Sequence, residues 1–504
     1  MTKEFDELLS FMQQKGFVWG PEPELYGGLS GFYTYAPLGK LLKNKVETRV
    51  RKFYNKNDFW EVECPLIMQK EVWKASGHLD GFSDPLIICS KCKSCFRVDN
   101  LIEELYPGEK PKDQIKFIEQ KHIKCPNCKG ELYKEIKKHD LMMKTNIGIN
   151  IEAYIRPETA TTTYLPFIRY NDFFRKKIPF GVFQIGKAFR NEISPRQHIL
   201  RMREFTQAEA QLFLLQKQKS EYYGHKKIKD IKIKIWTDEE QEEHKKQIII
   251  SIEEAINKKI FKNKAYASMI SQAYSLIKEL GFPEEKIRLR QHLQDEKAFY
   301  ADDAWDIEVN TKSFGWIELC GVHDRTDYDL RQHGNATNKN LVALDENNNK
   351  QIPHIIEIAL GIDRTVFCLL DLFYEKKEKE EGKTVLKLPI HLAPIEVSVF
   401  PLVNKEGLPE IAYSIYTELK NEFICNYDDS GSIGKRYLRE EETGTPLCVT
   451  IDFDTKEKNT VTIRERETGK QVSITVKELH QAIHKYYSGE SIEKIGKLVK
   501  KEKI

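Results

Sequence analysis

The spacing of apolar residues predicts a long helix followed by a strand near the start of the chain. Between Pro37 and Asn57, apolar residues recur at helical intervals, at Leu38, Leu42, Val46, Val50 and Phe53. The segment from Trp60 to Met68 is predicted as a strand, and the Cys64-Pro65 step marks its end because proline restricts the residue before it. A long helix is therefore expected to lead into a strand.

Two apolar segments between Gly181 and Phe213 predict a long antiparallel hairpin. VFQIGKAF and REFTQAEAQLF have the composition of strands, and a polar loop from Ser194 to Leu200 separates them. Farther along, EKAFYADDAWDIEVN and FGWIELCGVHDRTDYDL resume a strand-like alternation. Between these pairs, residues 220–290 mix Lys-rich and Glu-rich stretches with helical spacing at Ile248, Ile252 and Ile256, which predicts an insert within one sheet.

The last part of the chain is predicted to be a separate small α/β domain. A charged run, YEKKEKEEGK at 374–383, precedes it. Beyond this run HLAPIEVSVFPL, a helix near 408–423, CVTIDF and TVTIRER alternate as βαβ units do. The pattern divides the chain into a main domain at 1–85, 141–219 and 291–383, a cysteine-bearing insert at 86–140, a helical insert at 220–290, and a final domain at 384–504.

Composition narrows the class of protein. With 504 residues the chain has room for about three domains. A net charge of +3 excludes a histone-like binder, so any nucleic-acid surface must be local. At 40% hydrophobic residues the chain can bury a core, yet it has no run long enough for a membrane helix. The first residues have no apolar signal core, so we expect a cytoplasmic protein.

Five of the ten cysteines lie between Cys89 and Cys128, which predicts a metal site. Two Cys-x-x-Cys pairs, 89/92 and 125/128, can place four thiolates around Zn²⁺ with no open position, so the site would be structural. Cys95 is left out because four ligands complete the site. The alternatives are reduced surface thiols, or His122 in place of one thiolate.

The hairpin carries groups suited to a nucleotide. Alternation puts Arg190 and Glu192 on one face, and on the return strand it puts Phe205, Gln207 and Glu209 on one face. Guanidinium groups such as those of Arg201 and Arg203 bind phosphate oxygens in forked geometry, and an aromatic face can stack on a purine. The chain has no Gly-rich phosphate loop, so a nucleoside triphosphate would be held by arginines. The alternative is a solvated hairpin edge.

Three segments resemble the motifs of the class II aminoacyl-tRNA synthetases. FRNEISPRQHILRMREFTQAEAQLF is similar to motif 2, the helix and strand around Pro65 resemble motif 1, and IPHIIEIALGIDRTVFCLL, with Gly361 and Arg364, resembles motif 3. The resemblance implies a catalytic α+β domain with an antiparallel sheet of seven-stranded type flanked by helices. It also implies catalysis by the main domain, a carboxy-terminal α/β anticodon-binding domain, a tRNA contact by the helical insert at 220–290, and a homodimer formed through motif 1.

A narrower resemblance is to the dimeric glycyl-tRNA synthetases, archaeal or bacterial type with a four-cysteine insert. It rests on GGLSGFYTYAPLGKLLKN, VWKASGH, IRPETA, FRNEISPR and GVHDRTDYDL. Glycine, ATP with Mg²⁺ and tRNA(Gly) are the implied substrates, and no membrane is involved. The alternatives are a class II synthetase for another small amino acid, or a synthetase-like nucleic-acid-binding subunit without catalysis.

This family's residues can be carried over by position. On ATP, Arg190 would hold the α-phosphate and the amino-acid carboxylate, Glu192 the adenine amino group and Arg201 the outer phosphates. Phe205 would stack on adenine, with Arg364 on its other face reaching the γ-phosphate. The implied glycine-binding residues are Glu158, Glu209, Arg325, Glu357 and Ala359. The family commonly has serine where this chain has Ala359, although parity with Glu357 still predicts that Ala359 faces the pocket.

Overall fold

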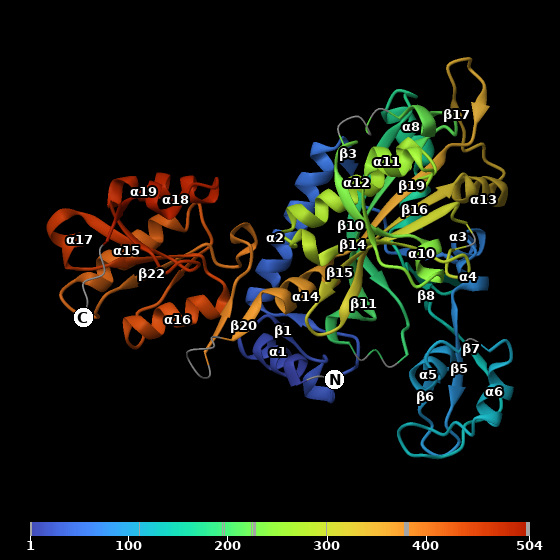
Figure 1. Cartoon of the computed structure of the whole chain (residues 1–504), viewed down its shortest axis with the longest axis horizontal. Coiled ribbons are helices and arrows are strands. Elements are labelled where there is room, and N and C mark those ends of the chain that lie inside the picture. Colours follow the sequence, from blue (N-terminus) through green and yellow to red (C-terminus); the bar gives the residue numbers. More distant parts are fainter. Residues whose placement is uncertain are drawn as a thin grey trace.

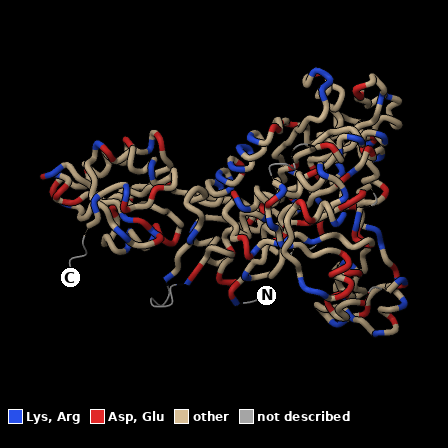
Figure 2. Tube along the Cα trace, turned by 45° about the horizontal axis from the view of Figure 1, so that its top comes forward, with Lys and Arg blue, Asp and Glu red and all other residues tan. Residues whose placement is uncertain are grey.

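The computed structural model describes residues 3–499 except 110, 194, 196, 223, 225–227, 299 and 377–382. Figure 1 shows the carboxy-terminal part, in red, at one end of the molecule and a large sheet with its helices in the middle. A small part with helices α5 and α6 projects on the other side of the sheet. Lysine, arginine and acidic residues are intermixed throughout, so no single-sign region dominates (Figure 2).

A nine-stranded sheet forms the centre of the catalytic part. Its order is β13 (Ile248–Ser251), β12 (Lys232–Trp236), β14 (Ile287–Gln291), β15 (Asp303–Thr311), β16 (Gly315–Thr326), β19 (His354–Gly361), β11 (Glu204–Leu214), β10 (Phe180–Phe189) and β3 (Phe59–Glu61). Only the β12–β14 and β10–β3 pairs in this sheet are parallel. The antiparallel class II sheet is therefore confirmed, with nine described strands instead of seven.

The two faces of this sheet have different partners. Even-numbered residues of β11 and β19, such as Ala208 and Ile358, join a large apolar core with helices α2 (Pro37–Lys56), α12 (Lys264–Glu279) and α14 (Ile362–Phe373). One end of the opposite face is covered by a second core that includes α7 (Ala160–Tyr164), α8 (Phe167–Phe173) and α13 (Tyr328–Thr337). The rest of that face, with odd-numbered residues of β11 and β19, stays open as a cavity.

The predicted helix at 37–57 is α2, and the predicted hairpin is β10 and β11, paired from Phe180↔Phe213 to Phe189↔Glu204. Ser194, where its loop was expected to begin, lies outside the described residues. The strand predicted from Trp60 to Met68 is instead two strands. β3 joins the large sheet, whereas β4 (Ile67–Gln69) pairs with β9 (Ile151–Ile155) in a small sheet with β8 (Met143–Ile147). Pro65 lies between them.

Residues 220–290 differ from the expected helical insert. They contain helices α10 (Asp238–Glu242), α11 (Ile252–Asn257) and α12, but also strands β12, β13 and most of β14, which extend the catalytic sheet. Ile248, part of the expected helical repeat, lies in β13, whereas Ile252 and Ile256 lie in α11. A four-residue spacing is compatible with one face of either a helix or a strand, so the pattern could not separate them.

The cysteine-bearing part is a compact unit with its own small core. Strands β6 (Cys95–Arg97), β5 (Ser83–Ile88) and β7 (Lys137–Asp140) form a sheet beside helices α5 (Val98–Leu105) and α6 (Gln114–Gln120). Ile87, Val98, Ile102 and Ile118 are among its buried apolar residues. Such a small core can contribute little stability alone, which is typical of units that need a metal or disulfides.

The carboxy-terminal part is an α/β domain, as predicted. Its six-stranded sheet has the order β23 (Cys425–Tyr427), β22 (Val397–Pro401), β24 (Leu447–Ile451), β25 (Thr460–Glu465), β26 (Gln471–Thr475) and β27 (Lys497–Leu498). Helices α15 (Leu408–Leu419) and α18 (Leu479–Tyr487) pack into its core. Most of the charged run at 374–383 lies outside the described residues. Its first three residues form β20 (Tyr374–Lys376), which pairs with β21 (Thr384–Leu386) just after the run.

Candidate active site

One cavity of about 710 Å³ opens on the face of the catalytic sheet that the helices leave free. Every residue that the sequence predicted for ATP or glycine lines it, namely Arg190, Glu192, Arg201, Phe205, Arg364, Glu158, Glu209, Arg325, Glu357 and Ala359. Phe205 and Glu209 come from β11, whereas Arg190, Glu192 and Arg201, which alternation had placed on or beside the strands, lie in the connection between β10 and β11. The others come from the strand and helix of motif 3, strand β16 and the segment before α7. The fold therefore gathers side chains that lie up to 206 positions apart (364 minus 158).

Strand register sets the floor of the cavity. Glu209 of β11 pairs with Ala359 of β19, which pairs with Gly321 of β16. In the same way Glu357 of β19 pairs with His323 of β16. Residues directly opposite one another in a sheet point to the same face, so these rows present one carboxylate each. The prediction that Glu357 and Ala359 face the same cavity is confirmed.

Glu357 is fixed at the floor by several partners. The carboxylate accepts hydrogen bonds from Gln211 and Tyr164, each at 2.9 Å, and lies 3.4 Å from a guanidinium nitrogen of Arg325. His323 stands 3.3 Å away. Burial raises the pKa of Glu357, but the charge of Arg325 and the contact with His323 outweigh it, so the pKa lies below its usual range. Glu357 is therefore a fixed negative charge.

Glu158 is a second fixed charge in the cavity wall. Its carboxylate accepts a hydrogen bond from Thr161 at 2.8 Å and lies 3.5 Å from His78. Burial raises its pKa, yet the charges of His78 and Arg325 and the hydrogen bonds together hold the pKa below its ordinary value. His78 is itself held by a 2.8 Å hydrogen bond between its Nδ1 and the hydroxyl of Ser76.

The pKa of the third acid, Glu209, is shifted in the opposite direction, upward. It is 2% exposed, and Thr159 donates a hydrogen bond to its carboxylate at 2.5 Å. Burial, together with the negative charges of Glu357 and Glu158, raises the pKa of Glu209 to about 8. Glu158, Glu209 and Glu357 thus lie close enough to influence one another, and Glu209 is mostly protonated at neutral pH.

The other end of the cavity is lined with arginines. Arg190 lies between two aromatic rings, those of Phe82 and Phe205, with its guanidinium carbon 5.3 Å from each centroid. Its Nε donates to the carbonyl of Pro157 at 3.1 Å. Two aromatic rings and a backbone carbonyl thus hold the Arg190 guanidinium, whose remaining N–H groups can donate to an anion.

The two further arginines at this end are paired with acids. Arg201 lies 2.8 Å from the carboxylate of Glu192, and Arg364 lies 3.1 Å from that of Glu318. Both pairs are partly open to solvent, so their partners can be exchanged for phosphate oxygens at modest cost. Arg190, Arg201 and Arg364 thus line one end of the cavity together with the acids Glu192 and Glu318, whereas Glu158, Glu209 and Glu357 line the other end with Arg325.

The cysteine-bearing part reaches this cavity. Asp84 and Arg97, which lie 3.1 Å apart, both line its wall. His139 of β7 is hydrogen-bonded to the carbonyl of Asn191 at 2.7 Å, and the amide of Asn191 donates to the carbonyl of Leu141 at 2.9 Å. Asn191 stands between Arg190 and Glu192 in the connection that follows β10. The base of the cysteine-bearing part is therefore hydrogen-bonded to the segment that carries these two site residues.

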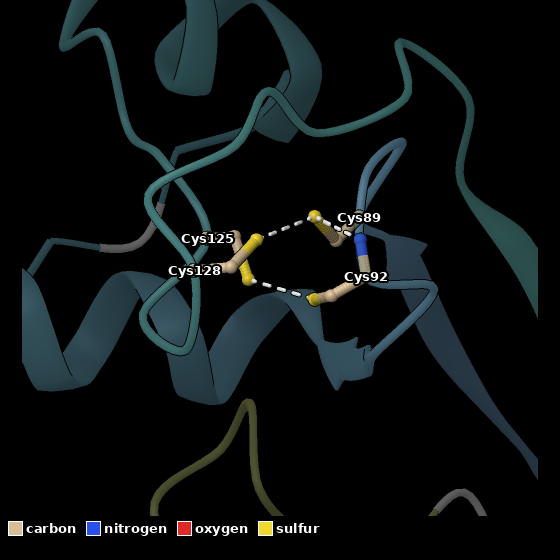
Figure 3. Close-up of side chains that lie close together, drawn as sticks. All are labelled: Cys89, Cys92, Cys125 and Cys128. Atoms are coloured by element: carbon tan, nitrogen blue, oxygen red, sulfur yellow. Dashed lines mark hydrogen bonds between the residues drawn. The ribbon is translucent and has the colours of Figure 1, made fainter.

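The four predicted metal ligands form one cluster. The sulfur atoms of Cys89, Cys92, Cys125 and Cys128 all lie within 4.8 Å of one another. Figure 3 shows the two pairs facing each other, with Cys89 and Cys128 at 3.5 Å and Cys92 and Cys125 at 3.6 Å. Four thiolates around Zn²⁺ at about 2.3 Å would stand about 3.8 Å apart. The donor set and its spacing therefore fit tetrahedral zinc.

Cys95, which was left out of the predicted site, and His122, the alternative ligand, do not join this cluster. Cys95 instead donates to the carbonyl of Lys93 at 3.7 Å, and neither it nor His122 belongs to the group among the described residues. The glycine after the second pair, Gly130, is packed closely: a Cβ there would stand 3.2 Å from the sulfur of Cys128 and 3.4 Å from that of Cys89. Glycine at 130 thus leaves room for the sulfur cluster.

Sequence reasoning missed several side chains of the site. His323 has the same parity as Arg325 on one strand, so alternation could have placed it in the cavity. His78 and Phe82 come from the segment before the cysteine-bearing part, and no local pattern links them to Glu158 or Arg190. Their contacts with the site depend on how distant segments pack.

Comparison with protein families assigns the chain to a class. The model of the class II tRNA synthetase core domain (G, H, P, S and T) matches residues 147–373, and the model of the anticodon-binding domain matches residues 396–486. Two prolyl-tRNA synthetases share the fold. That of Giardia lamblia has a TM-score of 0.58 and 15% identity over 94% of this chain and 76% of that one. That of Cryptosporidium parvum has 0.58 and 14% over 97% and 78%. Sheet, cavity and family models together define a class II aminoacyl-tRNA synthetase.

Individual relatives narrow the assignment. The chain is 36% identical to the glycine–tRNA ligase of Methanococcus maripaludis over 94% of this chain and 98% of the relative. It is 38% identical to that of Methanocaldococcus jannaschii over 94% and 97%, and 37% identical to that of Thermococcus gammatolerans over 97% and 99%. The chain belongs to the glycine–tRNA ligase family.

Proposed function

We propose that this chain activates glycine with ATP and transfers it to the terminal adenosine of tRNA(Gly). The observation that carries the proposal is the division of the cavity into a carboxylate end, with Glu158, Glu209 and Glu357, and an arginine end, with Arg190 and Arg364. A small zwitterion and a triphosphate need these opposite surroundings side by side. The family membership makes glycine and tRNA(Gly) the expected substrates.

At the arginine end we assign ATP. Arg190 binds the α-phosphate and the glycine carboxylate, while Arg201 and Arg364 leave Glu192 and Glu318 to bind the outer phosphates. Phe205 packs against the adenine ring. Glu192, freed from Arg201, accepts a hydrogen bond from the adenine amino group. Fixed guanidinium groups stabilise charge that develops on the phosphate during the reaction.

At the carboxylate end we assign the glycine ammonium. Glu158 and Glu357 supply permanent negative charge, and Glu209 loses its proton when the ammonium binds. Arg325 holds Glu357 in place and is itself held by Asp329 at 2.8 and 3.0 Å. A larger amino acid would need space that these side chains already occupy, which is how a site rejects an added methyl group.

The first step needs positioning and charge stabilisation but no nucleophile from the enzyme. A glycine carboxylate oxygen attacks the α-phosphorus in line, the bond to the bridging oxygen breaks, and glycyl-adenylate and pyrophosphate form. In the second step a ribose hydroxyl of the terminal adenosine attacks the glycyl carbonyl and AMP leaves. We assign no general base to the second step.

Two metals accompany this function. Mg²⁺ enters with ATP as part of the substrate, and Glu318, which lines the cavity beside Arg364, offers the oxygen ligands that Mg²⁺ prefers. Zn²⁺ would be held by Cys89, Cys92, Cys125 and Cys128 in a closed structural site. Bound there, it supplies cross-linking of the small unit and no chemistry to the reaction.

We further propose a cytoplasmic homodimer whose carboxy-terminal domain binds the anticodon. No helix in the described ranges is long and apolar enough to cross a membrane. Exposed apolar side chains lie around the motif 1 strand, including Trp60 and Phe173, whose rings stand 5.5 Å apart. An exposed aromatic pair is a feature of protein interfaces. Sedimentation of the purified protein would test the dimer.

The decisive experiment is amino-acid-dependent exchange between ATP and pyrophosphate. We expect exchange with glycine and little with alanine, serine or proline. Arg190→Ala should reduce the rate by roughly 10²- to 10⁴-fold because it removes a donor aimed at developing charge. The matched control is Arg331→Ala, a surface arginine that pairs with Asp327 and should leave exchange unchanged.

Other outcomes would point to the alternatives. Exchange with another small amino acid in preference to glycine would indicate a class II synthetase of different specificity. Binding of tRNA with no exchange for any amino acid would indicate a synthetase-like subunit without catalysis. Normal exchange by Arg190→Ala would contradict the assignment of the arginine end to ATP.

A further inference from the structure

A buried polar network lies behind the nucleotide end of the cavity. Lys43 of α2 is 3% exposed, and its ammonium donates to Asp363 at 2.6 Å and to the Thr206 hydroxyl at 2.7 Å. Asp363 of α14 is 2% exposed and also accepts a hydrogen bond from the Tyr35 hydroxyl at 2.6 Å. Its second oxygen accepts the backbone N–H of Thr206 at 2.5 Å. Four segments, namely α2, β11, α14 and the short strand β2 (Thr34–Tyr35), are thereby joined at one carboxylate.

The network adjoins two residues that face ATP in the proposed function. Thr206 follows Phe205 on β11, and Asp363 precedes Arg364 on α14. Thr206 and Asp363 also line the cavity themselves. A backbone hydrogen bond to Asp363 therefore fixes the strand beside Phe205 against the helix turn beside Arg364.

Stability alone is a poor explanation for this arrangement. Removing two charges from water carries a large desolvation penalty, and an apolar pair of similar volume is often equally stable or more so. What an ion pair with directed hydrogen bonds provides is a fixed relative position of the groups that it joins. The groups joined here are the backbone of β11 and the first turn of α14.

We propose that Lys43 and Asp363 are positioning residues for ATP. They act on ATP through Phe205 and Arg364, whose separation and orientation they set. The proposal rests on the assignment of that end of the cavity to ATP. Because Glu357 and Glu209 are held by other partners, the network should act on ATP and leave glycine binding unaffected.

The test compares ATP binding with glycine binding in variants of the full chain. Lys43→Met should raise the KM for ATP in exchange, and the Kd for ATP measured by calorimetry, by about tenfold or more. The KM for glycine should change less than about twofold. The melting temperature should also fall, because Asp363 is left buried without its counter-ion.

A matched control separates positioning from stability. Lys219 and Asp324 form a second buried pair, with nitrogen–oxygen distances of 2.7 and 2.9 Å, and Lys219 does not line the cavity. Lys219→Met should lower the melting temperature in a similar way and leave the ATP constants unchanged. If Lys43→Met also leaves them unchanged, or weakens ATP and glycine equally, the positioning role is refuted.

A double variant covers the case in which Lys43→Met does not fold. Lys43→Met with Asp363→Asn leaves no buried charge, and the amide oxygen can still accept from Thr206, so stability should recover. Weak ATP binding in this folded double variant supports positioning by the ion pair, and normal ATP binding refutes it. Wild-type protein that binds ATP without glycine-dependent exchange would contradict the proposed function, while the ATP Kd values would still test the network.

Discussion

The pKa of Glu209 leads to a prediction about glycine binding. In the free site this carboxyl has a pKa of about 8, raised by burial and by the charges of Glu357 and Glu158. The glycine ammonium should bind the ionised form, because only that form supplies the third negative charge. Apparent affinity then scales with the ionised fraction. Roughly a tenth of Glu209 is ionised at pH 7 and about three quarters at pH 8.5.

The KM for glycine should therefore fall by about eightfold from pH 7 to pH 8.5. Exchange assays at saturating ATP would measure it, with wild type and Glu209→Gln in parallel. The variant should bind glycine more weakly at pH 8.5 and lose most of the pH dependence. The remaining titratable groups around the ammonium, among them Glu158 with His78 and Glu357 with His323, are unchanged in the variant and serve as an internal control.

The folding stability should fall as the pH rises, whereas the affinity for glycine should increase. A carboxyl whose pKa is higher in the folded chain than in the unfolded chain binds a proton on folding between those two values. The contribution of Glu209 to stability is therefore fully present below about pH 4.5 and is lost as the pH rises towards 8. Glu209→Gln should raise the melting temperature at pH 8.5 relative to wild type. A wild-type KM for glycine that is constant over this range, or a dependence that survives in Glu209→Gln, would refute the reasoning.

Three further predictions concern single positions. Purified protein should contain about one zinc per chain by elemental analysis; Cys89→Ser should lose it and Cys95→Ser should keep it, whereas full zinc in Cys89→Ser would refute the ligand set. Ala359→Ser should change the KM for glycine by at most about tenfold, since one neutral hydrogen bond is worth about 0.5 to 1.5 kcal/mol; equal activation of alanine or serine by wild type would contradict the glycine assignment. A Cβ at Gly321 would stand 2.7 Å from a ring carbon of His323, so Gly321→Ala should displace that ring and raise the KM for glycine several-fold, and an unchanged KM would show that His323 does not support the site.

The sequence predicted those parts of the site that depend on neighbours along one strand. Alternation alone placed Glu357 with Ala359, and Phe205 with Glu209, because side chains change face at every residue. The Cys-x-x-Cys pairs were equally local. The assignment of all these groups to one cavity came from family resemblance, since no local pattern shows which strands are adjacent.

Contacts between distant segments were beyond sequence reasoning. Lys43 has the helical setting of a surface lysine in the sequence, and only packing shows that it meets Asp363, 320 positions later. The Phe82 ring lies 5.3 Å from the Arg190 guanidinium carbon, because the base of the cysteine-bearing unit is hydrogen-bonded to the hairpin connection at Asn191. The strands at 232–236 and 248–251 were missed because short apolar segments fit helix and strand alike.

One strand carries contacts for both proposed substrates. Phe205 and Glu209 stand four residues apart on β11, on the same face, and each residue of a strand advances the chain by about 3.3 Å. About 13 Å of hydrogen-bonded backbone therefore separates the residue proposed to contact adenine from the residue proposed to contact the ammonium. The strand therefore fixes the distance between the two ends of the aminoacyl-adenylate that the site is proposed to bind. Side-chain substitutions can widen either end of the pocket, but they cannot change the backbone distance between its two ends. Substitutions can therefore alter which side chain or base the pocket accepts, while the length of ligand that it accepts stays constant.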